Sequence, residues 1–559
     1  MKEIMIVTLS LPNVTGNVPA EEPSAQFAFI DHFNLRRMYA IDEQALLSQT
    51  EAVKRNLDKA QEYGAGTYIL FSRSFEHLIN YDFPVEGLGD LTGIVHAVDS
   101  EHRARQAVFA RYLNEVLDYA AVRGIKVIFH TNQFEFPDGF YDLAGDKLSG
   151  TARVCPGKQL AYDALEAKIT EFFRKFPKCA GIQLTLSEAQ VSPKACDCEA
   201  CRNLTQAQRF AKVAEAAVRA CKPLDKLVLV RTWGGFETKE SLDLLPREVI
   251  CSTKHTLPDF HLATPPNPVL GLKADRQEVE FDAWGEYSGY NFFPCYMGDQ
   301  YAERIRLSFD RGVRRFGIRL NWDPMPDTPI NPIFDRPFGN EANIYVFSHL
   351  IADPTADPDE LLREYVANVY PESARQAAFE LYKRSFDLQT LWLTWQGHNA
   401  NDHSRVYRPS SRDSYAKRVK SQIGFAVPKE YADTRGLMDE RRHQIDDAYQ
   451  EAMRLITALG SDVPADWRHE LQRGARNAWF VAQGNCDCML MYAAHEEFEA
   501  GGPLPDLTAL GKEMESRTRR WQLADPAMFS PMRGESPLRM LEEIRVEGNG
   551  RQSCGWTAD

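Results

Sequence analysis

Short apolar runs rich in β-branched residues alternate with longer helical segments from the start of the chain to about residue 323. This alternation is typical of repeated βα units whose strands form one parallel sheet. Eight runs have the length of a strand, and eight parallel strands can close into a (β/α)8 TIM barrel, an α/β fold. The predicted strands are residues 3–8, 66–72, 125–130, 180–186, 226–232, 248–254, 278–284 and 315–321.

Glycine and proline mark the ends of the predicted helices. The helix after Asp42 ends at Gly64, the next ends at Gly124, and a third ends at Pro177. Glycine ends helices because it readily adopts a left-handed backbone, and proline cannot continue the hydrogen-bonding pattern. The three helices place apolar side chains at helical spacing, namely Leu46, Val53, Leu57 and Ala60, then Phe109, Leu113, Val116 and Ala120, and then Leu165, Ile169, Phe172 and Phe176.

A proline-rich segment after residue 323 interrupts the alternation, and mainly helical periodicity follows it. At 559 residues the chain exceeds the roughly 250–300 residues that one hydrophobic core usually serves. We therefore predict a barrel domain over residues 1–325 and an α-helical C-terminal domain over residues 340–545, in which Asp357 and Pro358 open one helix.

Charge and composition exclude several classes of partner. The net charge is −14, and lysine and arginine form no run that would neutralise successive phosphates, so nucleic acid is not expected. No stretch approaches the roughly 18 apolar residues of a membrane span, and residues 1–14 resemble a buried strand more than a signal peptide. The 11 cysteines follow no disulfide-scaffold spacing, which indicates reduced thiols and a cytoplasmic protein.

Polar side chains follow six of the predicted strands. In a β/α barrel the reactive groups lie at the C-terminal ends of the strands, so these residues are the candidates for a site. In strand order they are His130, Asn132, Gln133 and Glu135; Ser187 and Glu188; Arg231 and Trp233; Lys254, His255 and Asp259; Glu286 and Tyr287; and Arg319, Asn321, Trp322 and Asp323.

Three carboxylates, those of Glu188, Asp259 and Glu286, come from three different strands. Hydrolysis of a glycosidic bond requires a carboxylic acid beside the leaving oxygen and a carboxylate across the sugar ring. A separation of about 6.5–9.5 Å leaves room for a water and gives inversion, whereas about 5 Å gives retention through a covalent intermediate. A structural role stays open for each residue, as a helix cap, a turn residue or an ion-pair partner.

The strand ends also resemble, in the same order, the catalytic strands of the α-glucuronidases of glycoside hydrolase family 67. The resemblance covers residues 1–325 and extends loosely into the helical region through FSHLIADPTADPDELLREYV (347–366). The segments that carry it are GIQLTLSEAQ (181–190), VLVRTWGG (228–235), STKHTLPDFH (252–261) and EFDAWGEYSGY (280–290).

The resemblance implies a role for five of the candidate residues. Glu188 matches the proton donor, and Asp259 and Glu286 match the water-activating carboxylates of an inverting reaction. Arg231 and Lys254 match cations that hold the carboxylate of the uronic acid.

The chain departs from the family at two places. A further lysine of the family, four residues before the acid, is replaced by Leu184, which removes one partner of the sugar carboxylate. The β-rich N-terminal domain of the family has no counterpart ahead of the first predicted strand.

Further side chains at the strand ends are predicted to contact the substrate, each with a structural alternative. The aromatic residues could stack on a sugar or pack in the core, the cations could pair with barrel carboxylates, and His255 could be a satisfied core histidine. The predicted substrate-binding residues are Arg231, Lys254, His255, Trp233, His130, Asn132, Tyr287, Asn321 and Trp322.

Cys196, Cys198 and Cys201 place three thiols within six residues on the loop after the fourth predicted strand. Thiolates at this spacing can share one zinc ion, but a structural zinc site normally has four ligands and the sequence shows no fourth nearby. A structural zinc site and reduced cysteines that pack in the interior both stay open.

We therefore expect an exo-acting, inverting glycosidase that removes a terminal acidic sugar, such as α-linked glucuronate, from an oligosaccharide without a cofactor for catalysis. The helical domain is expected to close one wall of the site or to form a homodimer interface. Two alternatives stay open: a metal-dependent sugar isomerase or epimerase on the same barrel, and a non-catalytic carbohydrate-binding barrel.

Overall fold

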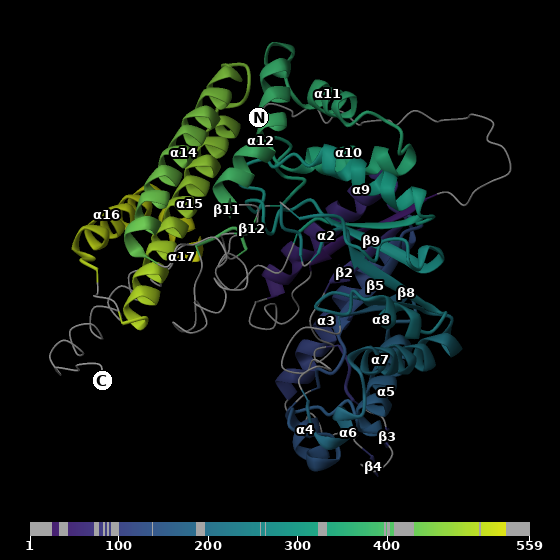
Figure 1. Cartoon of the computed structure of the whole chain (residues 1–559). Coiled ribbons are helices and arrows are strands. Elements are labelled where there is room, and N and C mark those ends of the chain that lie inside the picture. The colour runs from purple at the N-terminus through teal and green to yellow at the C-terminus, as the bar shows by residue number, and fades with distance from the viewer. Residues whose placement is uncertain are drawn as a thin grey trace.

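Eight parallel strands close into a barrel in the order β1, β10, β9, β8, β7, β6, β5, β2, which confirms the predicted fold class. Figure 1 shows the strands β2, β5, β8 and β9 with helices around them. The computed structural model describes residues 25–32, 43–71, 78–81, 84–85, 89–90, 100–136, 138–185, 196–257, 259–262, 264–321, 332–395, 398–399, 403–406, 430–501 and 505–532. The barrel strands are β1 (Gln26–His32), β2 (Thr67–Phe71), β5 (Lys126–Asn132), β6 (Gly181–Thr185), β7 (Leu227–Arg231), β8 (Val249–Lys254), β9 (Gln277–Asp282) and β10 (Arg315–Arg319).

The first barrel strand was predicted at the wrong place. It is β1, whereas the predicted strand 3–8 lies outside the described residues. The ring of Phe27 packs against Phe347 at 5.7 Å and that of Phe29 packs against Tyr63 at 6.2 Å, so these two side chains face the surrounding helices. The prediction failed because residues 3–8 are the more continuous apolar run, whereas β1 combines apolar side chains with Asp31 and His32.

The three predicted helices with marked ends are confirmed as α2 (Glu43–Tyr63), α3 (Ser100–Ala121) and α5 (Gln159–Lys175). Gly64 and Gly124 have φ values of 81° and 70°, the left-handed conformation that glycine adopts most easily. The predicted apolar faces are buried, except that the side chain of Leu46 lies outside the described residues.

Further helices follow the barrel strands along the chain. On α10, Phe347 packs against Phe27 of β1 and Phe281 of β9, so this helix covers the barrel even though it follows the proline-rich segment. The division into domains at residues 325–340 stays a prediction. These helices are α4 (Asp138–Ala144), α6 (Glu199–Arg202), α7 (Gln206–Cys221), α8 (Lys239–Leu244), α9 (Gly298–Asp310) and α10 (Glu341–Ala352).

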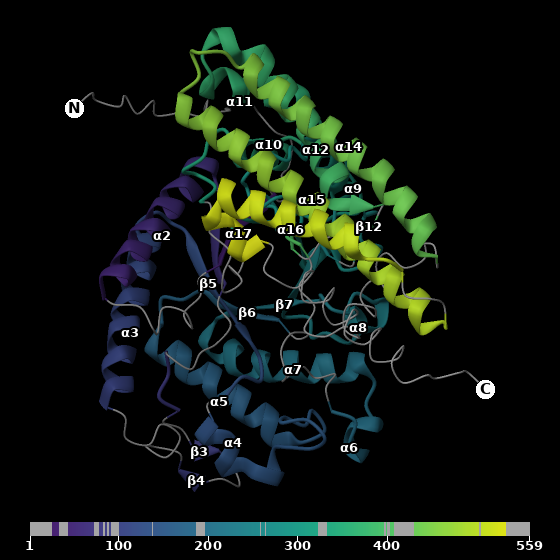
Figure 2. The same cartoon turned by 90° about the vertical axis from the view of Figure 1, so that its left-hand side faces the viewer.

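Long helices follow the barrel, and α14 and α15 run side by side across one side of the molecule (Figure 2). Asp357 caps α11, as predicted, because its side chain accepts a hydrogen bond from the backbone of Asp359. None of the described helices combines the length and the apolar content needed to cross a lipid bilayer. The helices are α11 (Pro358–Val369), α12 (Arg375–Leu393), α14 (Tyr431–Ala458), α15 (Ala465–Glu499), α16 (Thr508–Ala524) and α17 (Pro526–Met532).

Short elements occupy the connections. They are the strands β3 (Pro84–Val85), β4 (Gly89–Asp90), β11 (Thr394–Trp395) and β12 (His398–Asn399), and the single-turn helices η1 (Gly145–Lys147), η2 (Lys222–Leu224), η3 (Ala274–Arg276) and η4 (Glu372–Ala374).

The loop after β9, residues 283–297, is buried over its whole length between the barrel and the later helices. Gln389 of α12 donates a hydrogen bond to the carbonyl of Phe293 at 3.3 Å. On α15, a Cβ atom at Gly474 would lie 2.1 Å from the carbonyl oxygen of Phe292, so only glycine permits this approach. The helices α12 and α15 thus fix the position of this barrel loop.

Candidate active site

The inner face of β9 carries three acidic side chains. Glu278, Glu280 and Asp282 alternate with Val279 and Phe281, and because successive side chains of a strand point to opposite faces, the three acids share one face. All three are buried. Charged groups buried at this depth must be paired or neutralised.

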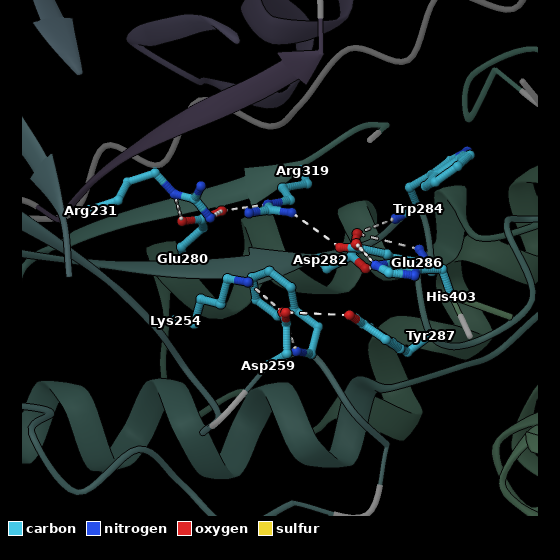
Figure 3. Close-up of polar contacts among 12 residues, drawn as sticks. Arg231, Lys254, Asp259, Glu280, Asp282, Trp284, Glu286, Tyr287, Arg319 and His403 are labelled. Atoms are coloured by element: carbon cyan, nitrogen blue, oxygen red, sulfur yellow. Dashed lines mark hydrogen bonds and ion pairs between the residues drawn. The ribbon is translucent and has the colours of Figure 1, made fainter. Parts of the chain in front are cut away.

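Glu280 is paired with two arginines. Nε and Nη2 of Arg231 donate to its carboxylate at 3.0 and 3.1 Å, and Nε of Arg319 donates to the same carboxylate (Figure 3). Burial would raise the pKa of Glu280, but the two guanidinium groups outweigh this effect and lower it to about 2. Arg231 therefore pairs with a carboxylate of the barrel, which was the structural alternative to its predicted role in binding substrate. The contact of Arg231 with substrate stays a prediction.

Lys254, the last residue of β8, forms a second ion pair with Asp259. The ammonium group lies 4.6 Å from the centre of the Trp233 ring and 4.7 Å from that of Phe260. Asp259 also accepts hydrogen bonds from the backbone N–H of Phe260 at 2.8 Å and from the hydroxyl of Tyr287 at 3.4 Å. Burial would raise the pKa of Asp259, but Lys254 holds it well below its usual range, so Asp259 is ionised.

The backbone after β9 presents Glu286 beside this pair. Asp282 accepts hydrogen bonds from the backbone N–H groups of Gly285 and Glu286 at 3.3 and 2.9 Å, which makes a tight turn at the strand end. Gly285 has a φ of 89°, and a Cβ atom there would lie 2.6 Å from Oγ of Ser288. The turn therefore depends on glycine at this position.

The carboxylate of Glu286 contacts one residue of the barrel and one from far along the chain. Nη1 of Arg319 lies 3.4 Å from one oxygen, and Nε2 of His403 lies 3.3 Å from the other. The His403 ring stacks on Tyr287 at 5.1 Å, and the hydroxyl of Ser404 donates to the carbonyl of Glu286 at 2.9 Å. Residues 403–404 therefore hold both the backbone and the side chain of Glu286.

Glu286 and Asp259 have opposite pKa shifts. Burial and then the negative charge of Asp259 raise the pKa of Glu286 to about 7, although His403 and Arg319 act in the other direction. Two carboxylates whose pKa values are driven apart can hold different protonation states at neutral pH. Such a pair can divide acid, base and charge-stabilising roles between its members.

Three other residues predicted to contact the substrate have partners within the protein. His130 is fully buried, lies 2.6 Å from Oγ1 of Thr185 and stacks on Phe71. His255 stacks on Phe281 at 4.5 Å, and burial lowers its pKa to about 3, so it is a neutral core histidine. Asn321 donates a hydrogen bond to Asp31.

Three predicted residues cannot be placed. Glu188 and Trp322 lie outside the described residues, as does the side chain of Asn132 at the end of β5. The roles assigned to these residues stay predictions.

Sequence reasoning missed Glu280, Asp282 and His403. The two acids could have been found from the sequence, because acidic residues at every second position of a predicted barrel strand must point to the same face. No sequence pattern points to His403, since it lies 117 positions after Glu286 (403 − 286) and only the fold brings the two together.

A group of four cysteines lies outside this site. Cys196, Cys198 and Cys201, which the sequence singled out, meet Cys155 from the loop between β5 and α5. The four sulfur atoms all lie within 4.8 Å of one another, and together they could bind a zinc ion.

Comparison with solved structures finds a protein of similar fold. A GH138 enzyme targeting pectin rhamnogalacturonan II matches 91% of this chain with a TM-score of 0.59 and 12% sequence identity. The chain spans 62% of the length of that enzyme. The match therefore shows that the two proteins share the TIM-barrel fold, and at this identity the similarity concerns the fold alone.

Two weaker matches are also to glycosidases. A mutant O-GlcNAc hydrolase of Thermobaculum terrenum matches 96% of this chain and 98% of its own, with 12% identity and a TM-score of 0.43. The GH20 catalytic modules of the pneumococcal exo-β-D-N-acetylglucosaminidase match 65% of this chain and 98% of their own, with 11% identity and a TM-score of 0.38. No protein-family model and no curated protein matches the chain. The resemblance to family 67 stays a prediction.

Proposed function

We propose that this protein is a glycoside hydrolase whose reaction takes place between Glu286 and Asp259 at the C-terminal ends of the barrel strands. Glu286 is the base that removes a proton from the attacking water. Asp259 stays ionised and stabilises the positive charge that develops on the sugar. Glu188, which follows β6 in the sequence, is proposed as the proton donor to the leaving oxygen.

The opposite pKa shifts of Glu286 and Asp259 carry this proposal. A general base works best when its pKa lies near the operating pH, and Glu286 is raised to about 7. The oxocarbenium-like transition state of glycoside hydrolysis gains positive charge, which the permanently ionised Asp259 can stabilise. A water held by Glu286 would attack the sugar face opposite Glu188, and this geometry gives inversion.

The substrate we propose is an oligosaccharide with a terminal acidic sugar of the α-glucuronate type. Lys254 is proposed to contact the sugar carboxylate. Trp233 lies beside its ammonium group, is half-buried and offers a ring on which the sugar can stack. The reaction needs no redox or nucleotide cofactor, and we place it in the cytoplasm. A homodimer formed through the helical region remains part of the proposal.

A screen of aryl and oligosaccharide α- and β-glycosides, with uronides included, tests the function. We expect release of a terminal uronic acid that EDTA does not inhibit, and NMR of the first product should show the inverted anomer. Glu188→Gln should abolish turnover while the variant still binds substrate. Binding without any hydrolysis by the native protein would indicate a receptor, and an EDTA-sensitive isomerisation would indicate the rival enzyme class.

The pH profile of kcat/KM tests the role of Glu286. Because the base must be ionised, activity should decline as the pH falls through about 7, the raised pKa of Glu286. Asp259→Asn removes a negative charge that raises this pKa, so the acidic limb of the residual activity should move to lower pH. An acidic limb near 4.5, the ordinary glutamate value, would contradict the assignment. A basic limb is expected as well, from deprotonation of the proposed donor Glu188, so the acidic limb is the part of the profile that tests Glu286.

A further inference from the structure

The sulfur atoms of the four clustered cysteines have the spacing of a metal site. Sγ of Cys155 lies 3.4 Å from Sγ of Cys198 and 3.4 Å from Sγ of Cys201. Zn–S bonds of about 2.3 Å in a tetrahedron place the sulfurs about 3.8 Å apart, whereas a disulfide needs about 2.05 Å. All four cysteines are free thiols. Their spacing is therefore too long for disulfides and close to that of four ligands on one ion.

The four cysteines form a small cluster of their own, separate from the main hydrophobic core. Cys155, Cys196 and Cys201 are its buried members, and among the described residues Cys198 and Ala152 are the partly buried ones that pack against them. Four thiols alone bury too little apolar surface to hold two loops together, since a metal or a disulfide usually supports so small a core.

Two glycines let the two loops that carry the cysteines pack closely against each other. A Cβ atom at Gly150 would lie 2.7 Å from Sγ of Cys196, and one at Gly157 would lie 2.8 Å from Cβ of Ala200. Glycine at these two positions lets the loop that carries Cys155 lie directly against the loop that carries the other three cysteines.

A buried arginine fixes the same loop and supplies positive charge. Nη1 of Arg209 donates to the carbonyl of Cys196 at 2.9 Å, and its Nη2 donates to the carbonyl of Cys201. Four thiolates around Zn²⁺ carry a net charge of about −2, which a cation at this place partly offsets. The hydroxyl of Thr151 also donates to Sγ of Cys196 at 3.5 Å.

We propose that Cys155, Cys196, Cys198 and Cys201 bind one structural zinc ion. The ion joins the loop between β5 and α5 to the loop between β6 and α7, two neighbouring loops at the C-terminal face of the barrel. With four protein ligands the site is closed, so the ion stabilises structure and leaves no position for substrate. This inference does not depend on the proposed hydrolase activity.

Metal analysis of the purified full-length protein tests the proposal. We expect about one zinc per chain in the native protein and none in Cys155→Ser, because serine removes a thiolate ligand. Cys198→His should keep the zinc, since histidine is also a zinc ligand and the Cys198 side chain is half-buried. Cys486→Ser, which changes a buried thiol of α15 outside the cluster, should keep it as well.

Thiol titration of the native protein gives a readout that requires no variant to fold. The four thiols should resist a disulfide reagent until a strong chelator removes the ion, and the midpoint of thermal unfolding should fall at the same time. Native protein without zinc, iron in its place, or thiols that react equally with and without chelator would each overturn the proposal.

Discussion

Glu286→Gln is expected to lower kcat by about 10³-fold, because glutamine cannot accept the proton of the attacking water. The amide keeps the size of the carboxylic acid and can still contact Arg319 and His403, so the affinity for substrate should change little. Single-turnover hydrolysis and calorimetric titration with the uronide substrate measure the two quantities separately.

Glu341→Gln is the matched control for this variant. Glu341 is also buried, burial raises its pKa, and it accepts a hydrogen bond from Tyr63 at 3.0 Å, yet it makes no described contact with Asp259 or Glu286. It should keep the native kcat. If Glu286→Gln kept activity similar to that of Glu341→Gln, Glu286 would not be the base.

Glu280→Gln is expected to destabilise the protein by about 3–5 kcal/mol, because it leaves buried Arg231 and Arg319 without the carboxylate that compensates both. Glutamine preserves the shape of the side chain, so the loss reports on charge more than on packing. Urea unfolding followed by circular dichroism measures the free energy of unfolding.

Asp118→Asn provides the comparison for this effect. Asp118 pairs with Lys178 on the surface, where both side chains are more than half exposed, and solvent screens such a pair. This variant should unfold at the same urea concentration as the native protein. Equal midpoints for Glu280→Gln and Asp118→Asn would mean that the barrel interior tolerates the two arginines without Glu280.

Seven of the eight barrel strands could be predicted from the sequence, since each is a short run of strand length in the alternating pattern, and β2, β5 and β6 follow helices with a marked end. Strand β1 could not be predicted in the same way. Its place depends on parallel pairing with β2 and β10, and the register of a strand depends on residues distant in the sequence. Residues 3–8 matched the local pattern better than β1 did.

The candidate site could be predicted only in part. Lys254, Asp259 and Glu286 were found because the C-terminal end of each strand is readable from the sequence, and the structure brings them together. The ion-pair partner of Arg231 could not be predicted from the sequence. The pairing of Arg231 with Glu280 depends on which inward-facing side chains lie in the same layer of the barrel.

The enclosed loop of residues 283–297 has a consequence for how defects in this protein would arise. Because α12 and α15 hold that loop against the barrel, a substitution that loosens either helix can displace Glu286 without touching any residue of the reaction. Inactivating substitutions in the helical region would then lower kcat in the same way as a change of a catalytic residue, although they act by displacing Glu286.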